Sequence, residues 1–401
     1  MKKKAYAVLL ACALLGTMLT GCTGSEASSD TEETAAEEEE ESDDAAADSA
    51  DENSQEASAD ETENAGEEET AGEEETAAED TQEEEGTAAG IPEGMYLSEL
   101  TGLPIDEDLL MQRPIAVMVD NEKTALEHYG IAEADIVYEM VNSTANNRIT
   151  RLMCVYKDWD DIEMIGSIRS VRPTNILIAQ EYEAVICHDG GPFYVDDYFS
   201  RYDIHFSGGF TRVDNGKATE FTEYVVDGDL ESKFASASFS SEYDEEPESH
   251  FNFVEYGTTA DLSEWSDTVF TALSVDLPFY HNSSRLVYNE ETETYDYYEY
   301  GSIHRDAEDD EVLTFDNVLL QSCDIHVYDD NGYLIYNCIA EYKEAYYLTK
   351  GEGIAILWSK TSESGVTHWY DATGNEIEIN TGKTYIAIVP EDTWDEVVFN
   401  Q

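Results

Sequence analysis

The residues with the most chemical potential lie in one short stretch, Gly-Ser-Ile-Arg-Ser-Val-Arg-Pro at 166–173. Arg169 and Arg172 stand three residues apart, and Pro173 suits the first turn of a helix because it has no amide hydrogen and a preset φ. Ser170 is the expected N-cap. Guanidinium groups near the positive end of a helix dipole are unfavourable unless an anion or a carboxylate lies between them. The stretch therefore predicts an anion subsite or, alternatively, structural ion pairs with the many acids of the chain.

Other polar residues follow the apolar runs of expected strands, and ligands of open α/β sheets bind at the carboxyl ends of strands. A hydrolase would use Asp120 or Glu139 as a base, His188 as its acid–base partner and the arginines as a clamp for an oxyanion or carboxylate. A binding protein would use the arginines to hold a carboxylate or phosphate of a cell-wall polymer. A third interpretation is a buried polar network that locks the fold. The candidate ligand-binding residues are Asp120, Asn121, Glu139, Arg151, Arg169, Arg172, His188 and Asp189.

The sequence carries none of the common signatures of cofactor or metal chemistry. It has no P-loop, no dinucleotide-binding glycine motif, no HExxH motif and no serine nucleophile elbow. Its 8 histidines include no two with metal-ligand spacing, so we expect neither a metal nor a cofactor. Whether the protein is an enzyme stays open at this point.

The first 21 residues are typical of a lipoprotein signal peptide. Three lysines precede an apolar run over 5–18 that is too short to span a membrane. Leu-Thr-Gly-Cys at 19–22 matches the bacterial lipobox, in which the signal is cut before the cysteine and the cysteine is acylated. The alternative is an ordinary secretory signal with a chance cysteine. We expect a protein held at the outer face of the cell membrane by fatty acid, such as palmitate, on Cys22.

The chain is strongly acidic, with 91 Asp and Glu against 20 Lys and Arg and a formal net charge of −71. Residues 22–96 are predicted to be a disordered acidic tether, because they lack the apolar area that offsets chain entropy and because like charges extend them. A helical stalk is the alternative. The charge repels nucleic acid. The expected partners are therefore the membrane, through Cys22, and a cell-wall polymer fragment or an envelope protein.

The remaining chain is long enough for two domains. Residues 97–275 are expected to form an N-terminal α+β or α/β domain with a mixed sheet, since continuous apolar runs suit strands covered on both faces. These runs lie at 113–121, 136–141 and 149–156, with one helix after Pro173.

Residues 276–401 are expected to form a mostly antiparallel β domain, because short runs rich in Tyr, Ile, Val and Trp alternate with turn signals. A single continuous domain is the alternative. Cys323 and Cys338 flank an expected hairpin at Asn331-Gly332, and whether they form a disulfide is left open.

Ten motifs follow one another along the chain: Arg113–Asn121, Ala134–Glu139, Ile149–Arg151, Gly166–Pro173, His188–Gly191, Gly301–Asp306, Asp316–Val318, Gly351–Gly353, Trp358–Lys360 and Gly374–Pro390. The order of these motifs resembles that of the YerB-like lipoproteins of Gram-positive bacteria. The resemblance covers most of 98–390 and implies a lipoprotein with two domains of unknown function, so it supports architecture more than mechanism. Members carry Gly-Gly where this chain has Asn146-Asn147-Arg148, and a Pro-His-Asn run where it has Glu220–Glu223 without a histidine.

Overall fold

A computed structural model describes residues 90–401. These residues fall within one compact unit. The predicted signal peptide, Cys22 and nearly all of the predicted tether lie outside the described residues. No helix of the described part of the chain is long and apolar enough to cross a membrane.

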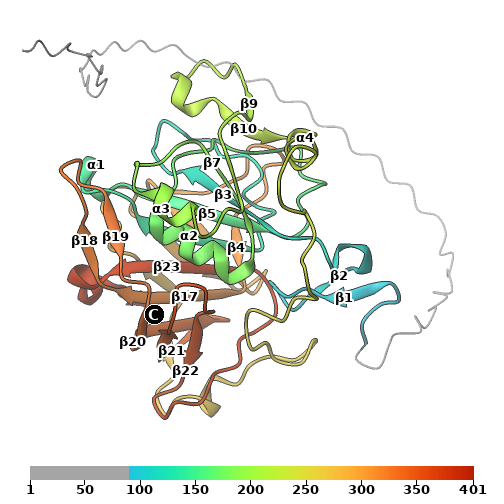
Figure 1. Ribbon diagram of the computed structural model, residues 1–401. Helices are drawn as coiled ribbons and strands as arrows, with labels where there is room; N and C mark the ends of the chain where they lie inside the picture. Colours follow the sequence, from blue (N-terminus) through green and yellow to red (C-terminus); the bar gives the residue numbers. More distant parts are fainter. Residues whose placement is uncertain (1–89) are drawn as a thin grey trace, which may run out of the picture. The chain divides into compact units, whose positions relative to one another are not determined.

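One eleven-stranded mixed sheet runs through both halves of the described chain (Figure 1). Its path is β11-β21-β20-β17-β23-β4-β5-β3-β7-β8, and β22 pairs with β21. Strand β23 pairs in parallel with β4, so a strand from near the C-terminus lies beside a strand of the first half. The strands are β3 (Ile115–Asp120), β4 (Ile136–Val141), β5 (Thr150–Tyr156), β7 (Val185–His188), β8 (His205–Ser207), β11 (Phe270–Thr271), β17 (Asn317–Cys323), β20 (Ala340–Thr349), β21 (Glu352–Lys360), β22 (His368–Tyr370) and β23 (Thr384–Pro390).

The central strands are apolar along their whole length because both of their faces are covered. Every residue of β3, β4 and β5 is buried, as expected for strands between two layers. Figure 1 shows α2 and α3 lying over one face of this sheet. The mixed sheet predicted for the N-terminal region is confirmed. The helices are α1 (Ala145–Arg148), α2 (Pro173–Ala179), α3 (Val195–Phe199) and α4 (Asp229–Phe234), with short 3-10 helices at Glu107–Leu109, Gln180–Tyr182, Thr219–Phe221, Leu262–Glu264 and Glu391–Glu396.

Helix α2 begins at Pro173 as predicted, but its N-cap is Arg172 and not Ser170. The backbone N–H of Arg172 donates to Oδ1 of Asn175 at 2.9 Å. An amide side chain inside the first turn therefore accepts from the backbone N–H of the N-cap residue, as in the second half of a capping box.

The C-terminal half adds a second, antiparallel sheet in the order β15-β14-β13-β12-β24, with β16 on β14. It approaches the large sheet where the ring of Tyr297 on β14 lies 5.7 Å from that of Tyr385 on β23. The mostly antiparallel strands predicted for this region are confirmed. The remaining strands are β1 (Met95–Leu97), β2 (Pro104–Asp106), β6 (Met164–Gly166), β9 (Thr211–Arg212), β10 (Glu223–Val226), β12 (Ser274–Asp276), β13 (Arg285–Asn289), β14 (Thr294–Glu299), β15 (Ser302–Ile303), β16 (Thr314–Phe315), β18 (Ile325–Val327), β19 (Leu334–Tyr336) and β24 (Val398–Asn400).

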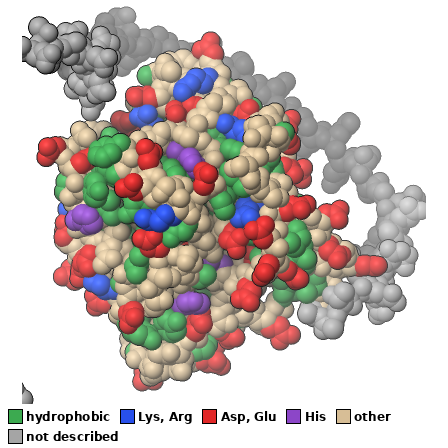
Figure 2. Space-filling view, viewed as in Figure 1, with side chains coloured by type: hydrophobic (Ala, Val, Ile, Leu, Met, Phe, Trp, Pro, Cys, Tyr) green, Lys and Arg blue, Asp and Glu red, His purple; other side chains and the backbone are tan. Residues whose placement is uncertain are grey.

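The visible face of the molecule is acidic, as the composition predicts. Figure 2 shows acidic side chains spread over the visible face, with few basic ones between them.

The cysteines at 154, 187, 323 and 338 are buried and free. Cys323 and Cys338 are thus not joined, and burial raises the pKa of the Cys338 thiol to about 12, which disfavours the reactive thiolate.

A core substitution in the second half should destabilise the whole described unit. Leu320 is fully buried on β17, next to β23, so Leu320→Ala should cost about 2–5 kcal/mol of unfolding free energy. Because one sheet spans both halves, urea unfolding should remain a single transition that coincides for circular dichroism and tryptophan fluorescence. Leu273→Ala, at a side chain 39% exposed, is the control with little effect. Two separate transitions would contradict the shared sheet.

Candidate functional site

The predicted arginine cluster exists as a set of partly buried contacts around Asp120. The register of β3 and β5 pairs Asp120 with Arg151, and Arg169 donates from Nε to Oδ2 of Asp120 at 2.6 Å. Burial acts to lower the pKa of Arg169, but the Asp120 carboxylate outweighs it and raises that pKa. Burial lowers the pKa of Arg151 to about 10.

The third guanidinium group, on Arg172, is held by other contacts. It lies 4.1 Å from the centre of the Tyr333 ring, and Nη1 donates to the carbonyl of Val171. The space between Arg151, Arg172 and Tyr336 is too small to admit a water molecule. The arginines are therefore close together, but this space offers no room for a guest.

Glu139 is fully buried in the middle of β4 and is saturated with hydrogen bonds. Its two carboxylate oxygens accept from five side chains at 2.5–3.3 Å. Burial raises the pKa of Glu139 above its ordinary value, although the hydrogen bonds oppose the change. A carboxylate with this many donors joins elements together. The donors are Asn121, Asn282, Ser284, Tyr297 and Tyr385.

His188 and Asp189 lie at the end of β7 but make contacts of their own. Nδ1 of His188 lies 2.7 Å from the Gly190 carbonyl oxygen, and Nε2 lies 3.0 Å from Nδ1 of His205. Burial lowers the pKa of His188 to about 4. Asp189 forms an ion pair with Arg212. Both ring nitrogens of His188 thus have protein partners.

A second cluster, which sequence reasoning missed, lies where the two halves meet. Glu299 ends β14, His304 follows β15, and His128 lies in the loop after β3. One ligand-type atom from each of these three buried side chains lies within 4.8 Å of the others. The only sequence signal was His304, inside one motif of the family resemblance. His128 and His304 are too far apart in the chain to show metal-ligand spacing.

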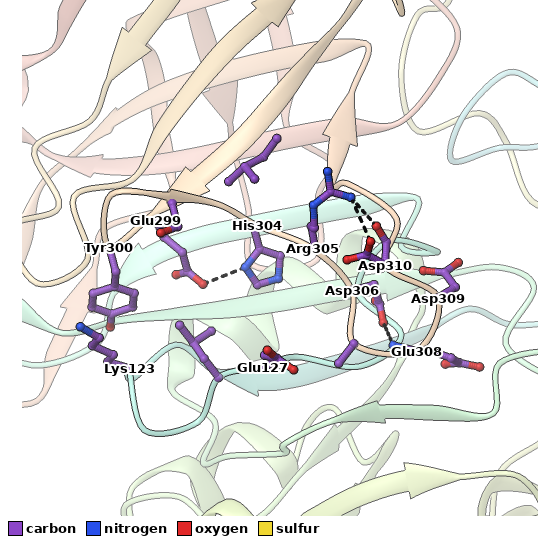
Figure 3. Close-up of a pocket in the computed structure, with 14 residues that line it drawn as sticks. Lys123, Glu127, Glu299, Tyr300, His304, Arg305, Asp306, Glu308, Asp309 and Asp310 are labelled. Carbon is purple, nitrogen blue, oxygen red and sulfur yellow. Dashed lines mark hydrogen bonds and ion pairs between the residues drawn. The ribbon is translucent and has the colours of Figure 1, made fainter. Parts of the chain in front are cut away.

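Next to this cluster is a cavity of about 700 Å³, which we call the junction pocket. Figure 3 shows Glu299 and His304 on its wall, with Glu127 on the opposite side. Residues 123–127 come from the first half and residues 299–310 from the second. The lining carries six carboxylates against two cationic groups: Glu127, Glu299, Asp306, Glu308, Asp309 and Asp310, with Lys123 and Arg305.

Comparison with known proteins places both sides of the junction pocket within one family. A family described as "Protein of unknown function (DUF3048)" matches twice, with its N-terminal domain over residues 100–240 and its C-terminal domain over residues 275–386. The chain belongs to this family. The domain boundary predicted at 275/276 stays a prediction. Within the DUF3048 family, His128 comes from the first domain, and Glu299 and His304 come from the second.

YerB of Bacillus subtilis (strain 168) carries a name that assigns it provisionally to the lipoproteins. It is 22% identical to this chain over 319 residues, which are 75% of this chain and 85% of YerB. The crystal structure of the YerB protein from Bacillus subtilis matches with a TM-score of 0.65 and 19% identity. That match covers 76% of this chain and the whole of the other. At 19% identity, this structural likeness shows that the two proteins share a fold.

A carboxylate clamp fixes the two halves against each other at the junction pocket. Asp306 accepts hydrogen bonds from the backbone N–H groups of Gly130, Ile131 and Ala132 at 2.6–3.1 Å, and from its own loop at Glu308. Gly130 has a φ of +66°, and a Cβ there would lie 2.4 Å from a backbone oxygen. Only glycine therefore suits position 130 of this loop.

Removing the Asp306 side chain should destabilise the protein much more than removing an exposed acidic side chain. Asp306→Ala leaves four backbone N–H groups without their acceptor, so we expect a loss of about 2–4 kcal/mol of unfolding free energy. Asp309→Ala, at an exposed neighbour, is the matched control and should change it by less than about 1 kcal/mol. Urea titration measures both. Equal losses for the two variants would count against the clamp.

Proposed function

We propose that this protein is a lipid-anchored binding protein of the cell envelope, which holds an amine-bearing fragment of cell-wall peptide in the junction pocket. The observation that carries the proposal is the pocket itself. Both family domains line it, and carboxylates outnumber cationic groups on its wall. Sites for small ligands are commonly found at such junctions, with volumes of about 300–1,000 Å³.

The location at the outer face of the membrane is supported by the sequence and by a relative. Residues 1–22 combine a basic start, a short apolar run and a lipobox cysteine at Cys22. The related YerB protein carries a lipoprotein name. A single acyl chain binds a membrane weakly, so stable anchoring uses a second chain or another signal.

The charge of the junction pocket favours a cationic ligand. Burial and the nearby Asp306 carboxylate raise the pKa of Glu308, as expected when like charges crowd one another. An ammonium group placed among these acids would relieve that repulsion. The phosphates of a teichoic acid would increase it. A wall peptide with a free amine therefore fits better than an anionic wall polymer.

The alternative function, a hydrolase acting on cell-wall material, receives less support from the predicted residues. Asp120 is ion-paired with Arg169, and both ring nitrogens of His188 have protein partners. Glu139 accepts five hydrogen bonds in the core. A general base must reach the proton that it removes, and each of these three groups is held by other protein partners instead.

Calorimetric titration with a synthetic wall stem peptide tests the ligand. The purified protein should release heat with the peptide that carries a free side-chain amine. The same peptide acetylated at that amine should bind much more weakly, because acetylation removes the charge. Glu127→Gln with Glu308→Gln should weaken the free-amine peptide about 5-fold, since exposed charge pairs contribute modestly.

The control for this titration is Glu264→Gln, at an exposed acid outside the pocket lining. It should leave the affinity unchanged. Equal binding of the free and acetylated peptides would remove the amine ligand from consideration. An absence of heat with both would overturn the proposed pocket ligand.

The anchor has a separate test in the native host. Wild-type protein should enter the detergent phase of a Triton X-114 separation, and Cys22→Ala should not, because the acylated thiol is missing. Cys187→Ala is the control for loss of a cysteine that is buried in the folded unit. Recovery of the wild-type protein in the aqueous phase would contradict lipid anchoring.

A further inference from the structure

Two buried histidines beside the junction pocket each have a ring nitrogen without a partner. His128 is completely buried and His304 is 5% exposed, and their ring centres lie 5.0 Å apart. Nδ1 of His128 and Nε2 of His304 have no hydrogen-bond partner among the described residues. Buried polar atoms are nearly always paired, so such atoms call for an explanation, and an ion or water is a common one.

The partners of the other two nitrogens define which atoms are free to bind an electrophile. Nε2 of His128 lies 2.6 Å from the carbonyl oxygen of Asp120. A carbonyl oxygen can only accept, so Nε2 carries the hydrogen and Nδ1 keeps a lone pair. Nδ1 of His304 lies 2.9 Å from Oε1 of Glu299. In a neutral His304 ring, Nε2 therefore also keeps a lone pair.

Glu299 adds a buried negative charge to the same place. It is 3% exposed, and its one ion-pair contact within the described range is His304. Next to it, Asn282 donates to both Glu139 and Glu299, at 2.8 and 3.5 Å. A buried carboxylate with no lysine or arginine partner is costly unless a cation or further donors compensate it.

We propose that His128, Glu299 and His304 form a binding site for one divalent transition-metal ion of the zinc type. Two imidazoles and a carboxylate are a common protein ligand set for zinc. One ligand-type atom of each side chain lies within 4.8 Å of the other two, and side-chain rotations would bring the ligand atoms to the edge of about 3.3 Å in a tetrahedral site. If His304 keeps its bond to Glu299, the carboxylate orients a metal-bound ring. If the ion displaces that bond, Glu299 binds the ion directly.

The surrounding backbone holds these three side chains in place. Tyr300 and Gly301, with φ values of +50° and +79°, form the two-residue turn between β14 and β15 that a tight hairpin requires. This turn fixes Glu299 opposite Ser302, two residues before His304. The N–H of Ala307 donates to the carbonyl of His128 at 2.9 Å, next to the Asp306 clamp. The hairpin turn and this backbone hydrogen bond therefore hold both histidines in place.

An ion at this site would have one side open to the junction pocket. Glu299 and His304 line the pocket, whereas His128 does not. With all three side chains bound to the ion, one position remains, which is the arrangement of zinc sites that bind a water or a further ligand. The inference goes beyond the wall-peptide proposal and does not need it, because the metal and the peptide are assayed separately.

Titration of zinc into metal-free full-length protein tests the site. The protein is stripped with EDTA and titrated with Zn²⁺ against a chromogenic chelator, with excess Mg²⁺ to occupy surface acids. We expect one tight equivalent. His128→Ala, His304→Ala and Glu299→Gln should each weaken it by about 100-fold or more, since even loss of an orienting partner costs about 10–100-fold.

Two control variants separate ligand loss from general damage. His326→Ala removes an exposed histidine, and Glu264→Gln alters an exposed carboxylate outside both the proposed ligand set and the junction pocket. Both should keep the tight equivalent. No tight equivalent in the wild-type protein, or full affinity in the folded ligand variants, would overturn the proposal.

A second measurement uses the unaltered protein, in case a ligand variant fails to fold. Co²⁺ added to metal-free wild-type protein should give the intense visible absorption bands of a four- or five-coordinate site with nitrogen and oxygen ligands, and one equivalent of Zn²⁺ should abolish them. Weak bands like those of hydrated Co²⁺ would mean that only surface acids bind the ion, and the proposal would fall.

Discussion

The parallel pairing of β4 with β23 is the constraint on which the rest of this structure depends. It joins the two family domains into one sheet, and Glu139 on β4 reinforces it by accepting hydrogen bonds from Tyr385 on β23 and from residues beside the second sheet. Without this pairing the loop that carries His128 would not meet the hairpin that carries Glu299 and His304. The junction pocket is therefore a product of how the domains join, and neither domain forms it alone.

Two buried carboxylates at this junction behave differently because their partners differ. Burial raises the pKa of Glu139, whose partners are hydroxyl and amide groups. Burial also acts to raise the pKa of Glu299, but the contact with His304 outweighs it and lowers that pKa. Glu139 is thereby suited to joining layers of the core. Glu299 carries charge at the pocket wall, where a cation would be stabilised.

Much of the fold could be predicted from the sequence, because continuous apolar runs such as Ile115–Asp120 indicate covered strands. The proximity of Asp120 and Arg151 could also be predicted, because they lie at the end of one predicted strand and near the start of another. Strand β20 was not predicted, since Ala340–Thr349 mixes charged residues with tyrosines and only its second half is buried. His128 and His304 could not be matched, because loop contacts such as the Asp306 clamp bring them together, and periodicity carries no signal for such contacts. The prediction of Ser170 as the N-cap of α2 was wrong because Pro173 is the first helical residue, so Arg172, directly before it, is the N-cap.

The most direct measurement is X-ray diffraction from crystals of the zinc-loaded protein, recorded above and below the zinc absorption edge. The anomalous difference map locates the ion without relying on any variant. The account predicts its strongest peak between the side chains of His128, Glu299 and His304, with the open side of the ion facing the junction pocket. Peaks confined to exposed carboxylates, with none at these three side chains, would contradict it.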